Sequence, residues 1–384
     1  MHIVVAVDAV GIRNGGGMSV LLAVLEEALR REQLTTVLFA TPESERNLPF
    51  PSHSRLAVVE RPRETTRPAS RLWWYEKGFG RAAKAAGANV TLSLSGAAIP
   101  GRAVPAVTFI QQSLPFSREA LDCFGLAERA RLRLHGEYMR RACARSAAVL
   151  VQTRTMVSTV TSAFMLPQGK FLAVLTMPPA LTASGACEPT LQPMRAAPRG
   201  GRVLYVGNDS PYKNVPALQH ALSFLSDLTP SPALFLTTPP AGNANPRIVE
   251  LGALLPGALA EAYSLADVLV LPSYTETIGL PMIEAMRAGV PVCAADRPYA
   301  HEICGAAALY MDPNNPRSIA SVVGRVLTDA GLRNQLIELG KKQAEYLSAP
   351  NGCATMLDLL LRTGMDSRYT SDSYAKPTCL KYCS

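Results

Sequence analysis

Short runs of apolar residues alternate with amphipathic segments along most of the chain. Brief apolar runs bounded by polar or glycine positions are typical of buried parallel strands, whereas apolar residues at every third or fourth position predict helices. The first half of the chain therefore predicts strands at 2–7, 36–40, 90–93, 106–110, 148–152 and 171–175, and helices at 18–31, 72–86, 126–144 and 155–164.

The second half repeats this alternation. Its apolar runs and periodic segments predict strands at 202–206, 233–237, 247–251, 268–271 and 290–295, and helices at 215–224, 255–265, 281–288, 317–330, 331–346 and 353–362. A strand followed by a helix and a further strand, repeated in this way, is the pattern of a doubly wound parallel sheet. The fold class expected from the pattern is α/β, with two Rossmann-like domains.

Composition places the domain boundaries. Residues 177–200 contain five prolines, many small residues and no periodicity, which is typical of a linker. We therefore expect a first domain at 1–180, a linker at 181–200, a second domain at 201–363 and a disordered tail at 364–384. Residues 42–70 are expected to be mostly loop.

The overall composition excludes several classes of protein. No apolar run reaches the length of about 20 residues that a membrane-spanning helix needs, and the first ten residues read as a strand rather than a signal peptide. The eight cysteines lack metal-site spacing, so free thiols and a cytoplasmic location are expected. No metal ligand set is predicted.

The positive charge is concentrated in the first half. Residues 1–180 hold 22 basic and 13 acidic residues, a balance of +9, whereas the remainder holds 16 and 17, a balance of −1. Six arginines fall within the helix predicted at 126–144 or directly after it. Such a surface suits an anionic membrane or a phosphorylated substrate; the alternative is a solvated helix face. Nucleic acid is the least favoured partner because few aromatic residues accompany the arginines.

A glycine run follows the first predicted strand. Gly15, Gly16 and Gly17 do not complete a dinucleotide fingerprint, since Val20 stands where the third glycine belongs and no acidic residue clearly ends the second strand. The run can let a ligand approach backbone N–H groups closely, or it can serve as a tight turn alone.

Two glutamates flank the start of the helix predicted at 281–288. Glu276 lies in the preceding loop with Gly279, and Glu284 lies in the first turn of the helix. Free N–H groups at a helix start bind anions, and carboxylates accept hydrogen bonds from vicinal hydroxyls, so the stretch suits a sugar or ribose. The alternative is that Glu284 only complements the helix dipole and Glu276 is solvated.

A lysine follows the first strand of the second domain. Lys213 lies in the loop Gly207–Asn214, from which it could reach a phosphate as a point charge. A single loop lysine can equally be solvated.

Spaced motifs in the second half resemble a known family. They are Pro272-Ser273, Glu276-Thr277-Ile278-Gly279-Leu280-Pro281, Glu284-Ala285-Met286, Gly289-Val290-Pro291-Val292 and Glu302-Ile303-Cys304-Gly305-Ala306-Ala307. In order and spacing this pattern, over about residues 200–347, resembles the retaining glycosyltransferases of family 4. These enzymes have the GT-B fold, in which two Rossmann-like domains face a cleft.

The resemblance implies transfer of a sugar from a nucleotide-sugar donor, UDP- or GDP-linked, with retention at the anomeric carbon and without a metal or other cofactor. Glu284 would bind the ribose, and Lys213 the diphosphate. Glu276 would lie by the donor sugar. The implied neighbours are the backbone N–H groups of Ile278, Gly279 and Leu280 at the sugar, Leu251 and Gly252 at the base, Gly16 and Gly17 near the diphosphate and acceptor, and Gln111 and Gln112 in the acceptor loop.

The chain departs from the family pattern at two places. Asn208 stands where the family usually has an arginine beside the diphosphate, so Arg202 and Arg13 are considered as replacement cations. Thr277 and Ile278 replace the usual glycine and phenylalanine. His135 and His301 are expected to be structural or solvated.

The expected acceptor is a lipid-linked or cell-envelope glycan, bound at the inner face of the membrane. Two alternatives remain at this point. One is a nucleotide-sugar epimerase on the same scaffold, and the other is a non-catalytic nucleotide-sugar-binding partner of an active transferase.

Overall fold

In the computed structural model, the chain divides into two compact units, each built around its own parallel sheet. The structure describes residues 2–12, 15–42, 50–61, 63, 67–101, 103–177, 180–182, 188–348 and 351–366. Unit 1 contains the described residues up to 116, those of 126–177, and those from 351 onward; unit 2 contains 117–125 and the described residues of 180–348.

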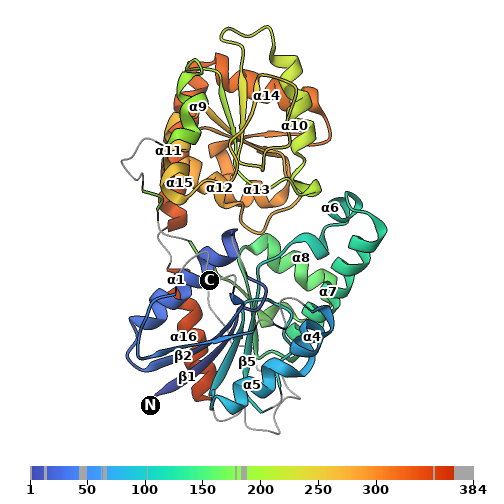
Figure 1. Cartoon of the computed structure of the whole chain (residues 1–384), viewed down its shortest axis with the longest axis vertical. Coiled ribbons are helices and arrows are strands. Elements are labelled where there is room, and N and C mark those ends of the chain that lie inside the picture. The colour runs from blue at the N-terminus through green and yellow to red at the C-terminus, as the bar shows by residue number, and fades with distance from the viewer. Residues whose placement is uncertain are drawn as a thin grey trace. The chain divides into compact units, whose positions relative to one another are not determined.

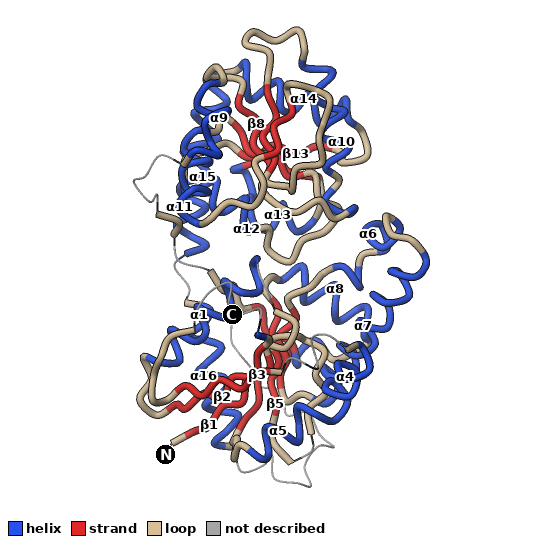
Figure 2. The backbone as a smooth tube through the Cα atoms, viewed as in Figure 1, coloured by secondary structure: helices blue, strands red, loops and turns tan. Residues whose placement is uncertain are grey.

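Unit 1 has a seven-stranded sheet in the order β3-β2-β1-β4-β5-β6-β7, and each neighbouring pair is parallel. Its strands lie between helices (Figure 2). Its strands are β1 (Ile3–Asp8), β2 (Leu34–Ala40), β3 (Leu56–Glu60), β4 (Val90–Ser93), β5 (Ala106–Ile110), β6 (Ala148–Val151) and β7 (Phe171–Ala173). The central strands are buried, as their continuous apolar runs predict.

Helical elements of unit 1 follow β1, β3, β5 and β6, and a last helix comes after the whole of unit 2 in the sequence (Figure 1). They are α1 (Gly15–Leu29), α4 (Pro68–Trp73) continuing through a π-helical turn at Trp74–Gly78 into α5 (Phe79–Ala85), a 3-10 turn at Leu114–Phe116, α7 (Leu126–Arg145), α8 (Arg154–Phe164), a 3-10 turn at Gln168–Lys170 and α16 (Gly352–Met365). Helix α1 begins at Gly15, so the glycine run is the first turn of the helix rather than a preceding loop.

Helix α16 corrects the expected domain boundary. It was expected to end the second domain at residue 363, yet Met356, Leu357 and Leu360 lie in the hydrophobic core of unit 1 with β1, β4 and α1 (Figure 1). Close packing accompanies this placement, since a Cβ at Gly352 would lie 2.1 Å from the Leu175 carbonyl oxygen. The apolar face of α16 is buried on the sheet of unit 1, which local sequence spacing could not indicate.

Unit 2 has a six-stranded parallel sheet in the order β10-β9-β8-β11-β12-β13. Its strands are β8 (Arg202–Tyr205), β9 (Ala233–Leu236), β10 (Ile248–Glu250), β11 (Val268–Leu271), β12 (Val292–Ala295) and β13 (Ala308–Met311). Its helices are α6 (Arg118–Asp122), α9 (Gln192–Ala196), α10 (Val215–Ala221), α11 (Pro256–Leu265), α12 (Leu280–Arg287), α13 (Pro298–Cys304), α14 (Pro316–Thr328) and α15 (Ala330–Ser348), with 3-10 turns at Pro189–Leu191, Pro211–Lys213, Leu222–Leu225 and Gly305–Ala307.

The expected linker also differs from the structure. Residues 189–196 form a 3-10 turn and helix α9, which packs against α11 of unit 2. The Arg195 guanidinium lies 2.6 Å from the Glu261 carboxylate of α11, and both side chains are largely buried. Ser117–Gly125 likewise makes its contacts within unit 2. Most of the expected disordered tail, residues 367–384, lies outside the described residues.

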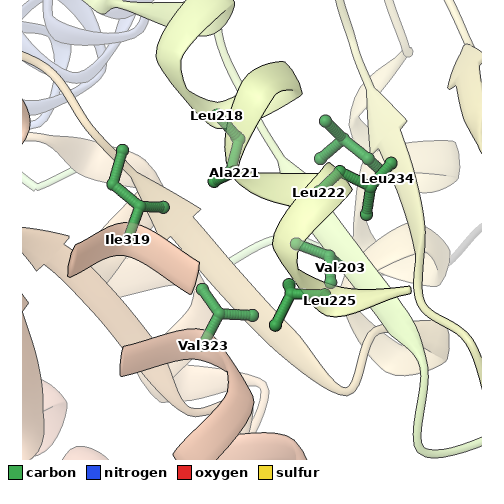
Figure 3. Close-up of a pocket in the computed structure, with 8 residues that line it drawn as sticks. All are labelled: Val203, Leu218, Ala221, Leu222, Leu225, Leu234, Ile319 and Val323. Atoms are coloured by element: carbon green, nitrogen blue, oxygen red, sulfur yellow. The ribbon is translucent and has the colours of Figure 1, made fainter. Parts of the chain in front are cut away.

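One small cavity lies in the core of unit 2, between the sheet and helices α10 and α14 (Figure 3). Its volume is about 10 Å³. A wholly apolar lining offers a water molecule no hydrogen-bond partner, so this space is a packing gap rather than a ligand site. The lining residues are Val203, Leu218, Ala221, Leu222, Leu225, Leu234, Ile319 and Val323.

Within the described part of the chain, no helix has both the length and the apolar character to cross a membrane. Those residues also contain no group of three or more His, Cys, Asp or Glu side chains placed to hold a metal ion.

Candidate functional site

The sheet of unit 2 has a topological switch point between β8 and β11. From β8 the chain proceeds outward to β9 and β10, and it then returns beside β8 and proceeds the other way through β11, β12 and β13. In open α/β sheets, the loops that leave the carboxyl ends of the strands at such a point diverge and form a ligand site. The loops after β8 and β11, together with helix α12 that follows the second one, carry seven of the thirteen site residues expected from the sequence.

The loop after β8 is held in a fixed shape. A Cβ at Gly207 would lie 2.6 Å from the Tyr205 hydroxyl oxygen, so only glycine fits there. That hydroxyl donates to the Asn208 carbonyl at 2.7 Å. The Asn208 side chain is exposed and accepts from the Ser210 backbone N–H at 3.1 Å. Asn208 thus shapes the turn and places no cation there.

Lys213 ends this loop just before helix α10. Asn214, the next residue, has left-handed backbone geometry with φ of 57°. Its buried side-chain amide donates to the Pro313 carbonyl at 2.6 Å, which fixes the loop against the end of the sheet.

Lys213 and Glu276 form a buried ion pair that joins the two loops. The Lys213 ammonium lies 2.5 Å from a Glu276 carboxylate oxygen, and the side chains are only 13% and 12% exposed. Burial disfavours the ammonium, but the Glu276 carboxylate and the Tyr212 hydroxyl outweigh that effect and raise the pKa of Lys213. Lys213 is therefore charged at neutral pH and lies beside the carboxylate that the sequence placed in the sugar site.

Gly279 shapes the loop after β11 where it enters helix α12. Its φ is +73°, and a Cβ there would lie 2.5 Å from the terminal methyl carbon of Met282. Ile278 is buried, Leu280 begins α12, and Pro281 occupies the first turn. The N–H groups at a helix start lack acceptors within the helix, so this turn can hold hydroxyl or phosphate oxygens.

Glu284 lies in the middle of α12 and points to helix α11. Its Oε2 accepts a hydrogen bond of 2.7 Å from the Tyr263 hydroxyl. Burial raises the pKa of Glu284, while the Tyr263 hydroxyl and the Arg287 guanidinium act in the opposite direction. The earlier alternative, in which Glu284 only complements the helix dipole, does not account for this specific partner.

The residues expected near the base follow β10. Leu251 is buried, and its N–H donates to the Leu236 carbonyl at 2.7 Å. Gly252 has φ of +72° and donates to the Thr238 carbonyl at 3.2 Å. They lie at the carboxyl end of an edge strand of the same sheet.

The remaining expected residues belong to unit 1. Gly16 and Gly17 lie in the first turn of α1, after β1. Gln111 follows β5 and donates to the Leu94 carbonyl at 3.1 Å, whereas Gln112 is exposed. The structure therefore puts these residues at the carboxyl ends of strands in unit 1, and the donor-site residues at the carboxyl ends of strands in unit 2.

Arg202 is not a replacement for the missing arginine. It begins β8, at the opposite end of the strand from the site loop, and its guanidinium donates to the Ala197, Arg195 and Leu265 carbonyls. The expectation that Arg202 could bind the diphosphate is wrong, because its guanidinium already donates hydrogen bonds to backbone carbonyls and lies away from the site loop. Arg13 lies outside the described residues.

Sequence reasoning missed a buried carboxylate in unit 1. Asp8 ends β1 at the switch point between β1 and β4, and it accepts hydrogen bonds from Trp74 Nε1 (2.9 Å), the Ser93 and Ser95 hydroxyls, and the Val10 N–H. Complete burial raises the pKa of Asp8, although these donors oppose the shift. An aspartate at the end of an apolar first strand was the available signal.

Two further site neighbours in unit 2 were also missed. Tyr263, the partner of Glu284, gave no sequence signal beyond its place in a helix. Arg297, after β12, forms a two-pronged ion pair with Glu119, with N–O distances of 2.5 and 3.0 Å, and Asn314 donates to the same carboxylate. The residues of this second cluster are far apart in the chain and come together only through folding.

The arginines of α7 are less available than composition implied. Arg131 pairs with Glu128, Arg140 with Glu137, and Arg141 with Glu76. At least three of the six arginines are thus paired with neighbouring carboxylates. His135 packs on Tyr75, and burial lowers the pKa of His135 to about 4, so this residue is neutral and structural.

Comparisons with known proteins fit this geometry. The sequence model of the family described as Glycosyl transferases group 1 matches residues 243–343. O-antigen chain mannosyltransferase B of Escherichia coli is 31% identical over 182 residues, which is 44% of this chain and 47% of that protein. The matches to the first curated relatives span from 25% to 47% of those proteins' own length.

The whole chain resembles solved structures in fold. WaaG, a glycosyltransferase involved in lipopolysaccharide biosynthesis, has a TM-score of 0.72 at 17% identity, covering 93% of this chain and 99% of that one. Anabaena HepE in complex with UDP-glucose has a TM-score of 0.68 at 15% identity, covering 94% and 100%. The protein therefore has the GT-B fold, and its second unit carries a Glycosyl transferases group 1 domain.

Proposed function

We propose that the protein is a metal-independent retaining glycosyltransferase of family 4, which moves a hexose from a UDP- or GDP-linked donor to an acceptor hydroxyl. The observation that carries the proposal is the buried Lys213–Glu276 pair at the switch point of unit 2, with Glu284 on the helix that follows. The group 1 domain over residues 243–343 and the fold likeness to glycosyltransferases support the same reading.

For each part of the nucleotide-sugar donor, unit 2 has a side chain or backbone group that can bind it. The charged Lys213 ammonium neutralises the diphosphate, which carries increasing charge as the glycosidic bond breaks. The Glu276 carboxylate accepts hydrogen bonds from sugar hydroxyls, and Glu284 accepts from the ribose. The backbone N–H groups of residues 278–280, at the start of α12, contribute further partial positive charge toward the leaving group.

The proposed mechanism uses no protein side chain as the base. The acceptor hydroxyl attacks the anomeric carbon from the face that the diphosphate leaves, and the departing phosphate oxygen takes the hydroxyl proton. This route preserves the anomeric configuration. In this proposal Lys213 and the α12 start supply the charge that a divalent cation supplies in other transferases.

The first test is loss of transfer in site variants. In Lys213→Ala and Glu284→Ala, sugar transfer from the best UDP- or GDP-sugar should fall by about 100-fold or more, the magnitude seen when a transition-state partner is removed. Lys341→Ala, at an exposed ion pair, is the control and should leave transfer unchanged. Undiminished transfer in both site variants would refute the mechanism.

The second test is the stereochemistry and metal dependence of the product. Proton NMR of the product made by the native protein should give the same anomeric configuration as the donor, and added EDTA should leave the rate unchanged. An inverted product would overturn retention, and a rate abolished by EDTA would overturn metal independence.

A non-catalytic nucleotide-sugar-binding partner is the second candidate, and Asn208 favours it because the loop after β8 carries no arginine. It predicts donor binding by calorimetry with neither transfer nor donor hydrolysis. A sugar epimer formed without any acceptor would instead indicate an epimerase.

For the acceptor, we propose a lipid-linked or cell-envelope glycan reached at the cytoplasmic face of an anionic membrane. The positive balance of the first 180 residues supports this, as do the exposed Arg133 and Leu134 on α7. Vesicles containing about one-third phosphatidylserine should retain the protein at low salt and release it at high salt. Equal recovery from neutral vesicles would contradict the electrostatic component.

A further inference from the structure

Among the described residues, Tyr263 provides the side-chain hydroxyl that donates a hydrogen bond to the Glu284 carboxylate. The tyrosine belongs to α11 and is 1% exposed, whereas Glu284 belongs to α12 and is only partly buried. The Tyr263 hydroxyl lies 2.7 Å from Glu284 Oε2 and 3.4 Å from the Pro281 carbonyl oxygen. A hydroxyl has one proton to donate, so the shorter contact with the carboxylate is the hydrogen bond.

This contact fixes one carboxylate oxygen and leaves the other for a ligand. The tyrosine ring is fixed by the core of unit 2, so its hydroxyl is a rigid reference point. A glutamate side chain that hung free from α12 would sample several rotamers and would lose that freedom when a ligand bound. With Oε2 already engaged, the carboxylate plane is set before the ligand arrives.

We propose that Tyr263 is a positioning residue that orients Glu284 toward the vicinal hydroxyls of the donor's ribose. This inference rests on the proposed function, in which Glu284 is the ribose ligand. Tyr263 itself does not touch the nucleotide. Tyr263 should therefore increase specificity for ribonucleotides over analogues that lack the two ribose hydroxyls. A carboxylate that is already oriented increases the affinity most for a ligand whose hydroxyls can donate to it in that orientation.

The experiment compares nucleotides that differ only in the ribose. Calorimetry measures the dissociation constants of UDP and 2′,3′-dideoxy-UDP, and of GDP and its dideoxy analogue, for the native protein and for Tyr263→Phe. The ribonucleotide should bind the variant roughly 2- to 13-fold more weakly, the factor that corresponds to one hydrogen bond of ordinary strength. Affinity for the dideoxy analogue should stay the same.

Tyr299→Phe is the matched control. Tyr299 is also fully buried in unit 2, and its hydroxyl donates to a backbone carbonyl, that of Ser273, at 2.8 Å. Its loss should lower stability as much as Tyr263→Phe does while leaving the ribo-to-dideoxy ratio unchanged. A merely structural role for Tyr263 predicts the same behaviour in both variants.

A pH profile gives a second readout. The titratable groups acting on Glu284 are Tyr263 of α11 and Arg287 of α12, and each lowers the pKa of Glu284 against the effect of burial. Removing the hydroxyl should therefore move the midpoint of ribonucleotide binding to higher pH. Tyr299→Phe should not move it.

The outcomes separate the two claims. A native protein that discriminates between the sugars, combined with a Tyr263→Phe variant that keeps the full ratio, overturns the positioning role alone. A native protein that binds UDP, GDP and their dideoxy analogues equally overturns the ribose role of Glu284 and with it the donor site proposed above. If Tyr263→Phe does not fold, Glu284→Asp replaces it: the shortened carboxylate cannot reach the Tyr263 hydroxyl from the same position, and an undiminished ratio would overturn the ribose role of Glu284 and, with it, the positioning role of Tyr263.

Discussion

At the scale of single residues, the proposed donor site consists of groups that also stabilise the fold. Lys213 and Glu276 are both largely buried, and the attraction between their opposite charges offsets the free-energy cost of removing each from water. Asp8 in unit 1 is comparable, since four donors surround a carboxylate that has no access to water. Substitutions at such positions change stability as well as chemistry.

Replacing Lys213 by Met should destabilise unit 2 by about 3–5 kcal/mol, because it leaves the Glu276 carboxylate buried without a counter-ion. Urea unfolding of the two proteins measures the difference. Lys341→Met is the control: its partner Glu338 is 67% exposed, so the expected change is within about 0.5 kcal/mol. The double variant Lys213→Met/Glu276→Gln should recover part of the loss, and a purely additive double variant would show that the two groups do not interact.

Nucleotide binding should depend on pH through Glu284. Burial raises the pKa of Glu284 above its ordinary value, so this carboxylate takes up a proton at a higher pH than an exposed glutamate does. Protonation places an O–H donor on one oxygen and removes the charge that strengthens the hydrogen bonds accepted from hydroxyls. Affinity for UDP or GDP should therefore be constant above this pKa and decline as the pH falls through it. In Glu284→Gln this decline should disappear from calorimetric titrations; if the same midpoint persists, another group is responsible.

At the scale of elements, the structure confirms the strands predicted from apolar runs and contains further elements that were not predicted. Strand β3 lies in a stretch expected to be loop. Its apolar run, residues 56–59, is short and stands among prolines and charged residues, and it forms an edge strand whose residues are mostly exposed. Strand β13 and helix α13 were not predicted, being only four and seven residues long. Short or exposed elements depend on their neighbours for stability and leave little pattern in the sequence.

Gly279→Ala tests the turn that begins α12. The positive φ alone should destabilise the protein by about 1–3 kcal/mol, and the 2.5 Å approach to Met282 adds a displacement of the backbone N–H groups. Nucleotide affinity should therefore fall as well. Gly305→Ala separates the two effects, since Gly305 also has a positive φ but a Cβ there would meet no atom within 4 Å. Calorimetry should show normal affinity in Gly305→Ala, and equal losses in both variants would refute the assignment.

At the scale of the whole molecule, the chain order and the spatial units do not coincide. The last described helix belongs to the core of unit 1, although it follows unit 2 in the sequence, and α6 of the first half makes its contacts in unit 2. The boundary expected at 181–200 was drawn from composition, which records flexibility and turn propensity but not which surface a helix covers.

Leu360→Ala should reveal the placement of α16. Leu360 is fully buried, so the truncation should destabilise unit 1 by about 2–5 kcal/mol. In a calorimetric scan that resolves two transitions, the transition of unit 1 should move to lower temperature and that of unit 2 should stay. Leu255→Ala, at a side chain 77% exposed, is the control and should move neither. Movement of the unit 2 transition in Leu360→Ala would contradict the placement.

The sequence alone determined the α/β class, the order of most strands and helices, and the loop and helix start that hold Glu276, Gly279 and Glu284. All of these depend on local spacing within one strand–helix–strand unit. Only the tertiary structure decided that Lys213 pairs with Glu276, 63 residues away, that Tyr263 engages Glu284, and that Arg202 is bonded to the backbone away from the site. Periodicity reports which face of an element is buried, whereas the partner of a buried charge depends on how elements pack, and that information is not local.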